Sequence, residues 1–221
     1  MRLFLIMVLC IASPGCGSDE EVSRAPQLVL VHKLFTADYE SACEKLLPKA
    51  EQAVEKLTGV EISPRLRFVD TLPAPAQQAV ALRTGDFVNI RRSYAQVATR
   101  RQLYNTLCHE MLHMAHIGDI FTKELVQYQQ WTQEKWALFK LRSAFDEGLS
   151  WRYAAELSAE KFGGKPYYYW DYVPASPVSR DVIVRTVMRT PEVALQAARD
   201  EKFAASFLWD HSRGRNKRKR K

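Results

Sequence analysis

Apolar residues in the first part of the chain gather in short runs rich in Val, Ile, Leu and Phe. Such runs predict β-strands, and they occur at 27–35, 60–70 and 85–93. Pro64 interrupts the second run, so we expect a broken strand there or a strand at the edge of a sheet. Between the first two runs, apolar residues repeat at helical spacing over 36–59, with a kink or break expected at Pro48. The predicted order is therefore strand, helix, strand, strand.

The remainder of the chain carries helical spacing. The segment 95–117 has no proline or glycine, and its apolar residues recur at helical intervals, which predicts a long helix. The other predicted helices span 123–142, 145–161, 179–189 and 191–209. An aromatic loop is expected at 165–177. The second part of the chain is thus predicted to be mostly helical.

The N-terminus has the layout of an export signal. Arg2 is followed by an apolar run from Leu3 to Ala12 that is too short to span a bilayer, and small residues come next. The segment around Cys16 resembles a bacterial lipoprotein processing site, in which this cysteine carries the lipid. We therefore expect an exported protein of the cell envelope, attached to the membrane through Cys16. The alternative is a cleaved signal and a released periplasmic or extracellular protein.

The formal net charge of +7 is concentrated at the C-terminal end. The tail Arg213–Lys221 holds seven basic residues and no acidic residue, so the rest of the chain is close to neutral. We expect residues 211–221 to form a basic, disordered tail, whose functional reading is contact with an anionic surface such as lipid headgroups. The export signal argues against nucleic acid as a partner.

Two cysteines, Cys43 and Cys108, remain in the body of the chain. An oxidising compartment would permit a disulfide between them, but two cysteines do not make a disulfide framework. For Cys108, on a predicted apolar helix, the simpler interpretation is a buried thiol.

The helix predicted at 95–117 contains the sequence CHEMLH, in which His109 and His113 stand four positions apart. At this spacing both imidazoles project from one helix face and can bind a single zinc ion. Glu110, next to His109, is placed to act as a general base on a water whose pKa zinc lowers to about 7. The alternative is an ordinary helix that is rich in histidine.

A catalytic zinc needs a third protein ligand. Glu147 stands downstream in the sequence AFDEGLSWRYAAE. This segment, together with the HExxH motif, resembles the gluzincin metallopeptidases, in which a second helix supplies a glutamate ligand in an EG context. The resemblance implies His109, His113 and Glu147 as Zn²⁺ ligands and Glu110 as the catalytic base. Trp151 stands where some of these families carry an aspartate that supports a histidine ligand, a role that Asp146 or a backbone carbonyl could take instead.

Other third ligands are open from the sequence. His116 shares the helix face, but three ligands from one straight helix converge poorly on one ion. Asp119 lies where the third ligand of metzincin-type sites falls, yet Gly118 and Asp119 also suit a helix end. The segment from Ile90 to His116 is also similar to SprT-like proteases, which act on DNA-bound proteins and use a downstream histidine.

The resemblance implies an α+β, zincin-like fold: a small mixed sheet with an antiparallel edge, packed on an active-site helix, and a helical C-terminal part. We expect a signal or lipoprotein segment at 1–16, one metallopeptidase domain at 27–210 and the tail at 211–221. The expected function is zinc-dependent hydrolysis of peptide or protein substrates; the alternative is a non-catalytic metal-binding envelope protein. Candidate donors to the oxyanion, which the sequence leaves open, are Tyr153, Tyr167, Tyr168, Tyr169, Tyr172 and His211.

Overall fold

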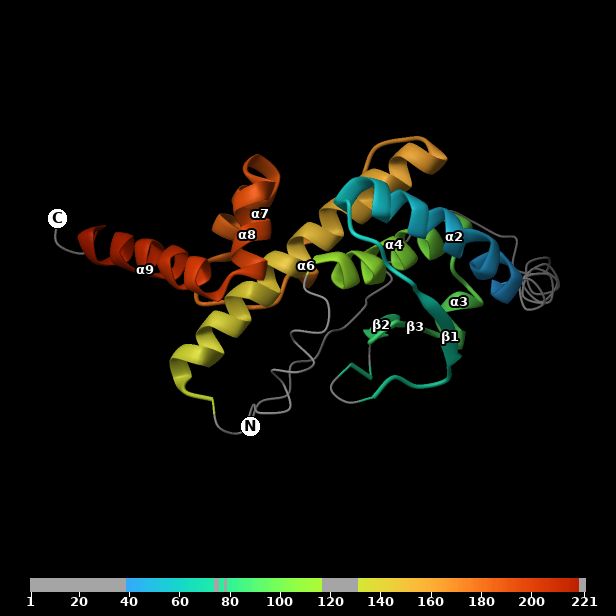
Figure 1. The fold of residues 1–221 in the computed structure, drawn as a ribbon, viewed down its shortest axis with the longest axis horizontal. Helices are drawn as coiled ribbons and strands as arrows, with labels where there is room; N and C mark the ends of the chain where they lie inside the picture. Colours follow the sequence, from blue (N-terminus) through green and yellow to red (C-terminus); the bar gives the residue numbers. More distant parts are fainter. Residues whose placement is uncertain (1–38, 74–75, 78, 117–130, 219–221) are drawn as a thin grey trace, which may run out of the picture.

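The computed structural model describes residues 39–73, 76–77, 79–116 and 131–218, and side chains as far as His211. These residues form a small sheet and a set of helices arranged along one long helix, α6 (Figure 1). The strand predicted at 27–35, the predicted export signal, Cys16 and Asp119 lie outside the described residues. The fold is α+β, as the sequence predicts, with helices predominating.

The sheet of the described residues has three strands in the order β1-β3-β2. β1 (Arg65–Val69) pairs in parallel with β3 (Phe87–Arg91), and β2 (Ala81–Thr84) pairs antiparallel with β3. The sheet is therefore mixed and has an antiparallel edge strand, β2, which confirms the predicted arrangement. β1 begins directly after Pro64 and lies at the other edge of the sheet that the described residues form, which agrees with the expectation from Pro64.

Strand β2 was not predicted from the sequence, which indicated only a connector before Gly85. The strand is short, and its residues Leu82–Thr84 mix apolar and polar side chains. Its pairing depends on the hairpin closed by Gly85, whose φ of 58° suits a residue without a Cβ. The side-chain amide of Asn89 on β3 then donates to the carbonyl of Leu82 and to Oγ1 of Thr84, which ties the hairpin together.

Helix α2 (Tyr39–Thr58) passes through Pro48 without interruption, so the alternative of a break there is wrong. Pro48 lies on the exposed face of the helix. The opposite face buries Cys43, Ala50 and Val54 in a core shared with the helix that follows the sheet. Burial of that continuous face stabilises the helix on both sides of the proline.

The helix predicted at 95–117 is present as α4 (Arg100–His116), which begins five residues later than predicted; a separate short helix, α3 (Arg92–Ala95), precedes it. The two helices predicted at 123–142 and 145–161 are a single helix in the described chain, α6 (Gln133–Phe162), which begins at the N-cap Thr132 and ends at Gly163. The predicted boundary near Arg142 is wrong because no helix-breaking residue stands there. Leu141, Phe145 and Leu149 continue one buried face across it.

Three helices follow the 3-10 turn η2 (Trp170–Tyr172): α7 (Arg180–Arg189), α8 (Pro191–Arg199) and α9 (Glu201–Arg218). The predicted helix 191–209 is divided at Asp200, whose carboxylate accepts hydrogen bonds from the backbone N–H groups of Lys202 and Phe203 and so caps α9. The backbone of α9 stays helical to Arg218, within the segment predicted to be a disordered tail.

Helix α6 joins two hydrophobic cores. Ala154, in its C-terminal half, packs into the core formed by α2, the sheet and α4, whereas Leu138 and Phe145 pack into the core formed with α7, α8 and α9. Asp146 and Glu147 therefore lie near the middle of α6, between the residues that enter the two cores. Cys43 and Cys108 are buried and free, so they form no disulfide. No helix among the described residues has the length and apolar character needed to cross a membrane.

Candidate metal centre

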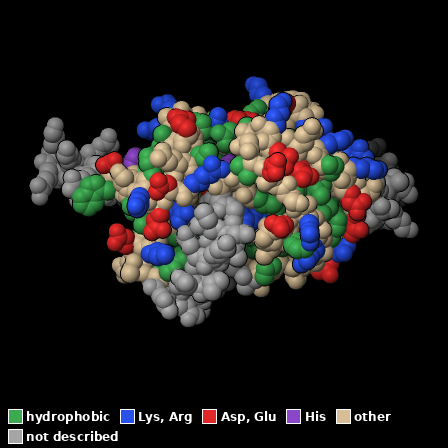
Figure 2. All heavy atoms as spheres, viewed as in Figure 1, with side chains coloured by type: hydrophobic (Ala, Val, Ile, Leu, Met, Phe, Trp, Pro, Cys, Tyr) green, Lys and Arg blue, Asp and Glu red, His purple; other side chains and the backbone are tan. Residues whose placement is uncertain are grey.

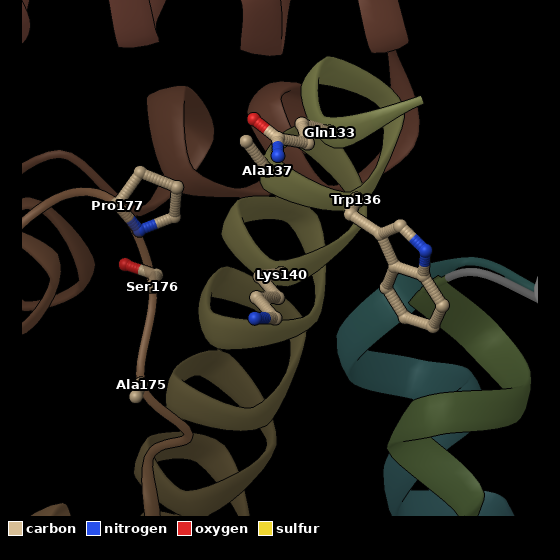
Figure 3. Close-up of a pocket in the computed structure, with 7 residues that line it drawn as sticks. All are labelled: Gln133, Trp136, Ala137, Lys140, Ala175, Ser176 and Pro177. Atoms are coloured by element: carbon tan, nitrogen blue, oxygen red, sulfur yellow. The ribbon is translucent and has the colours of Figure 1, made fainter. Parts of the chain in front are cut away.

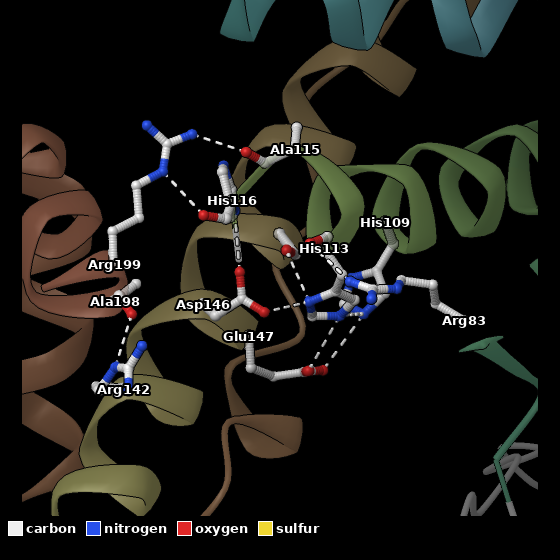
Figure 4. A network of polar contacts seen from close by, with 11 residues as sticks. Arg83, His109, His113, Ala115, His116, Arg142, Asp146, Glu147, Ala198 and Arg199 are labelled. Atoms are coloured by element: carbon white, nitrogen blue, oxygen red, sulfur yellow. Dashed lines mark hydrogen bonds and ion pairs between the residues drawn. The ribbon is translucent and has the colours of Figure 1, made fainter. Parts of the chain in front are cut away.

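His109 and His113 come from one face of α4, one helical turn apart, as their spacing predicts (Figure 4). Their Nε2 atoms lie 3.1 Å from each other, and their rings meet edge to face with centroids 4.7 Å apart. Both nitrogens therefore point into the same small space beside α6.

Glu147 on α6 closes this space from the opposite side. Its Oε1 lies 3.4 Å from Nε2 of His109, and its Oε2 lies 3.4 Å from Nε2 of His113. One ligand atom from each of the three residues lies within 4.8 Å of the others, so the group could hold a metal ion. The side chains are 7%, 18% and 25% exposed, respectively, which leaves an approach from solvent on the Glu147 side.

Asp146, the neighbour of Glu147, supports the histidines from behind. Its Oδ2 lies 2.5 Å from Nδ1 of His113, and its Oδ1 lies 3.2 Å from Nδ1 of His116. Oγ of Ser150, one turn further along α6, is 3.4 Å from the same His113 nitrogen. His116 is thus held by Asp146 and is not part of the three-residue group.

The charges within the group are strongly coupled. Burial by itself lowers the pKa of His113, but the carboxylates of Asp146 and Glu147 raise it well above its ordinary value. Burial by itself raises the pKa values of Asp146 and Glu147, but the adjacent histidines lower both below their usual range. Both carboxylates therefore favour their ionised form, which gives the group the negative charge that a bound cation would offset.

Glu110, the predicted base, is buried on the side of α4 that faces the sheet. Its Oε2 accepts a 2.7 Å hydrogen bond from the backbone N–H of Arg83 on β2. Because β2 is an edge strand paired only with β3 among the described strands, this N–H points away from the ladder and toward α4. The guanidinium of Arg83 also donates to the carbonyl of His113, so β2 is fixed against the motif at two points.

An aromatic cluster lies against His109. The indole of Trp151, one turn after Glu147, has its ring centroid 4.1 Å from the His109 imidazole. Tyr169 and Tyr172 of the predicted aromatic loop pack on the same indole, with centroids 4.9 and 5.6 Å away. Nδ1 of His109 is buried and has no hydrogen-bond partner in the described part of the chain.

The candidate oxyanion donors fall into four places. Tyr167, Tyr169 and Tyr172 belong to or border the aromatic cluster, whereas Tyr168 stacks on Trp170. The ring of Tyr153 lies 6.2 Å from that of His116. His211 is on α9, where its Nδ1 pairs with the carbonyl of Phe207, so it is fixed outside the three-residue group.

The end of α4 is held by α8. The guanidinium of Arg199 donates to the carbonyl of His116 at 2.8 Å and to the carbonyl of Ala115 at 2.7 Å (Figure 4). These are terminal carbonyls of the helix and lack partners within it. Arg199 thereby connects the C-terminal helices to the segment that carries the histidines. No sequence motif indicated this contact or that of Arg83, because both depend on tertiary packing.

A cavity of about 500 Å³ lies along α6, on the N-terminal side of Glu147 (Figure 3). It is lined by Gln133, Trp136, Ala137 and Lys140 of α6 and by the loop 175–177. Lys140 and Glu147 are seven residues apart, so they lie on nearly the same helix face, about 10 Å apart along the axis. Elsewhere on the surface, acidic and basic side chains are interspersed over the face seen in Figure 2.

The donor set fits a zinc ion. Two imidazole nitrogens and one carboxylate form a set that catalytic zinc sites use, with a fourth position open to water or substrate. The pairing of His113 with Asp146 supplies the outer hydrogen bond that orients such a ligand.

Comparisons with protein-family models, with curated proteins and with solved structures give no match for this chain.

Proposed function

We propose that this protein is a zinc-dependent peptidase, with His109, His113 and Glu147 as ligands and Glu110 as general base. The observation that carries the proposal is the convergence of three ligand atoms within 4.8 Å. The ligand atoms come from two helices, α4 and α6, that are distant in sequence. Glu110, which stands between the two histidines in the chain, is suited to act as a base. When bound, zinc would lower the pKa of a water molecule and polarise a carbonyl.

The presence of Glu110 supports a catalytic role for the group of His109, His113 and Glu147 over a purely structural role. A structural zinc site fills all four positions with protein ligands, whereas the described residues offer three at this group. Glu110 is adjacent to His109 and is oriented by the N–H of Arg83, which holds its carboxylate in one direction. A carboxylate held in this way can take a proton from a water and pass it to a leaving amine.

The edge of β2 supports a peptide as the substrate. The hydrogen bond of Arg83 to Glu110 places β2, an edge strand among the described strands, beside the catalytic residues. An extended peptide can bind such an edge through its backbone, which suits hydrolysis of peptide bonds with varied side chains. The cavity at Lys140 adds space along α6 for parts of a substrate away from the reacting bond.

We extend the proposal to a gluzincin-type, zincin-like architecture. The mixed sheet with β2 at its antiparallel edge, the helix α4 and the glutamate on α6 agree with that expectation. The SprT-like alternative requires a histidine as third ligand, and the third donor in the described residues is Glu147. Export and attachment through Cys16 remain part of the proposal on the strength of the N-terminal sequence alone.

The decisive test compares Glu110→Gln with the unchanged protein, using zinc content and cleavage of an unfolded protein substrate as readouts. The amide keeps the size of the side chain but cannot accept the proton. We expect full zinc content and loss of hydrolysis by at least about a hundredfold. Equal hydrolysis by purified Glu110→Gln protein would rule out the proposed base. Zinc binding without hydrolysis in the wild type, across several unfolded proteins, would favour the non-catalytic alternative.

A further inference from the structure

His109 and His113 differ in what holds their rings. Nδ1 of His113 is paired with Asp146, whereas Nδ1 of His109 is buried without a partner among the described residues. A histidine that binds a metal normally donates its second N–H to a carboxylate, a carbonyl or water, and this bond fixes the ring orientation. Among the described residues, a contact other than a hydrogen bond is therefore left to fix the ring of His109.

The contact with Trp151 can provide this orientation. The indole and the imidazole are tilted by 40°, with centroids 4.1 Å apart, which is close even for packed aromatic rings. His113 borders the same imidazole edge to face at 4.7 Å. Rotation of His109 about its Cβ–Cγ bond would drive the imidazole into one of these two rings. The indole therefore restricts the direction in which Nε2 points.

Trp151 is itself held in place by aromatic neighbours. Tyr169 packs on the indole at 4.9 Å and Tyr172 at 5.6 Å, and these two tyrosines are 5.9 Å from each other. The backbone N–H of Tyr172 donates to the carbonyl of Tyr169, which closes the turn that carries both. The loop is anchored further upstream by Arg101, whose guanidinium donates to the carbonyls of Gly163 and Lys165.

We propose that Trp151 is a positioning residue of the metal centre, whose indole orients His109 by ring packing where Asp146 orients His113 by hydrogen bonding. The proposal rests on the proposed metal centre and adds a role for the loop 165–177. Tyr169 and Tyr172 keep the indole against the imidazole, so this loop shapes the ligand geometry without contributing a ligand.

The test uses Co²⁺ in place of Zn²⁺, because the visible absorption of bound Co²⁺ reports the geometry of its ligands. The variants are Trp151→Leu, which removes the aromatic ring but keeps an apolar side chain, and Trp151→Phe, which keeps a ring. Trp136→Leu is the control, since Trp136 lies on the same helix but packs on Trp131 and Phe139. Circular dichroism checks that each variant is folded.

We expect Trp151→Leu to weaken Co²⁺ binding about tenfold and to change the absorption spectrum. Trp151→Phe should restore most of both, and Trp136→Leu should match the wild type. A folded Trp151→Leu protein with wild-type affinity and spectrum would overturn the positioning role while leaving the metal centre intact. If Trp151→Leu does not fold, the Co²⁺ spectrum of Tyr172→Leu decides, with Trp151→Phe as the folded reference that keeps a ring at position 151. A wild-type spectrum for Tyr172→Leu overturns the role of the cluster, and an altered spectrum supports it. Wild-type protein that binds no Co²⁺ contradicts the metal centre itself.

Discussion

Oδ2 of Asp146 lies 2.5 Å from Nδ1 of His113, on the side of the imidazole ring opposite to the nitrogen that faces Glu147. One residue thus supports the ligand group while its neighbour in sequence belongs to it. The arrangement follows from helix geometry, because adjacent residues on α6 point in directions about 100° apart. Asp146 therefore reaches behind the histidines while Glu147 reaches in front of them.

This pairing predicts the effect of Asp146→Asn. The amide keeps the shape of the side chain but loses the charge that makes His113 a stronger ligand, so zinc affinity should fall by about ten- to a hundredfold. His116→Gln, which alters the other partner of Asp146, should have a much smaller effect. Competition with a chromophoric chelator measures both affinities. Equal affinity of Asp146→Asn and wild type would show that the carboxylate does not support the ligand.

The raised pKa of His113 predicts how metal binding depends on pH. Asp146 and Glu147 raise that pKa well above its ordinary value despite burial, so His113 carries a proton in the metal-free protein near neutral pH. Zinc requires the neutral imidazole and must displace this proton. The affinity should therefore rise about tenfold for each unit of pH, up to the raised pKa, and level off above it. Below that pKa, falling pH weakens binding.

Calorimetry in buffers of different ionisation enthalpy measures the protons released. We expect about one proton per zinc ion at pH 7. His113→Ala would not serve as a control because it removes a ligand; Asp146→Asn does, since it lowers the pKa of His113 and should reduce the release. Zinc binding with no proton release at pH 7 would show that His113 is already neutral.

The hydrogen bond from Arg83 to Glu110 predicts a specific effect of proline. Arg83→Pro removes the backbone N–H that orients Glu110, and an edge strand tolerates a proline whose nitrogen faces away from the ladder. Arg83→Ala keeps the N–H and removes only the side chain. We expect lower kcat for the proline variant than for the alanine variant, with equal zinc content. Equal kcat in the two variants would mean that this N–H does not contribute to the orientation of Glu110.

Arg199 on α8 is expected to stabilise the C-terminal end of α4. Its guanidinium satisfies the carbonyls of Ala115 and His116, and hydrogen bonds to a charged donor contribute about 1.5 to 3 kcal/mol. Arg199→Ala should lower the free energy of unfolding of the metal-free protein by about 2 kcal/mol. Arg199→Lys, with fewer donors, should lose an intermediate amount. Urea denaturation measures the change, and an unchanged midpoint and slope would contradict the role of this contact.

The close approach of α6 and α7 explains why a glycine, Gly148, follows Glu147. A Cβ at this position would lie 3.1 Å from Cγ2 of Val187 on α7 and 3.8 Å from Cγ2 of Ile183, so the absence of a side chain lets the two helices approach. Gly148→Val should destabilise the protein by about 1 to 3 kcal/mol through overpacking. Gly148→Ala should cost less, because alanine favours the helix by about 1 kcal/mol over glycine. Thermal unfolding distinguishes the two variants; equal melting temperatures of Gly148→Val and wild type would contradict the packing account.

The sequence predicts the elements whose signals are local. The spacing of His109 and His113 predicts a common helix face, and the apolar run at 85–93 predicts a strand where β3 lies; both are present. The boundary placed within α6 is wrong because the apolar pattern there continues without a stop. β2 escaped prediction because its stability comes from pairing with β3, which no local pattern reveals.

For the site, the resemblance to gluzincins implied Glu147, and the structure brings that residue to the two histidines. Asp146 was one of two open choices for the supporting group, and its contact with His113 identifies it as a partner of that ligand. The contacts of Trp151 and Arg83 were not predictable, because each joins residues through packing of separate elements. Sequence spacing specifies which side chains share a helix face, but the packing of α4 on α6 decides which faces meet.

The zinc content per protomer, determined by elemental analysis for wild type, Glu147→Ala and His116→Ala, tests the metal centre most directly. We expect about one zinc ion in the wild type and in His116→Ala, and almost none in Glu147→Ala, since Glu147 belongs to the three-residue group and His116 does not. A folded wild type without zinc, or a Glu147→Ala variant that keeps it while His116→Ala loses it, would contradict the proposed metal centre.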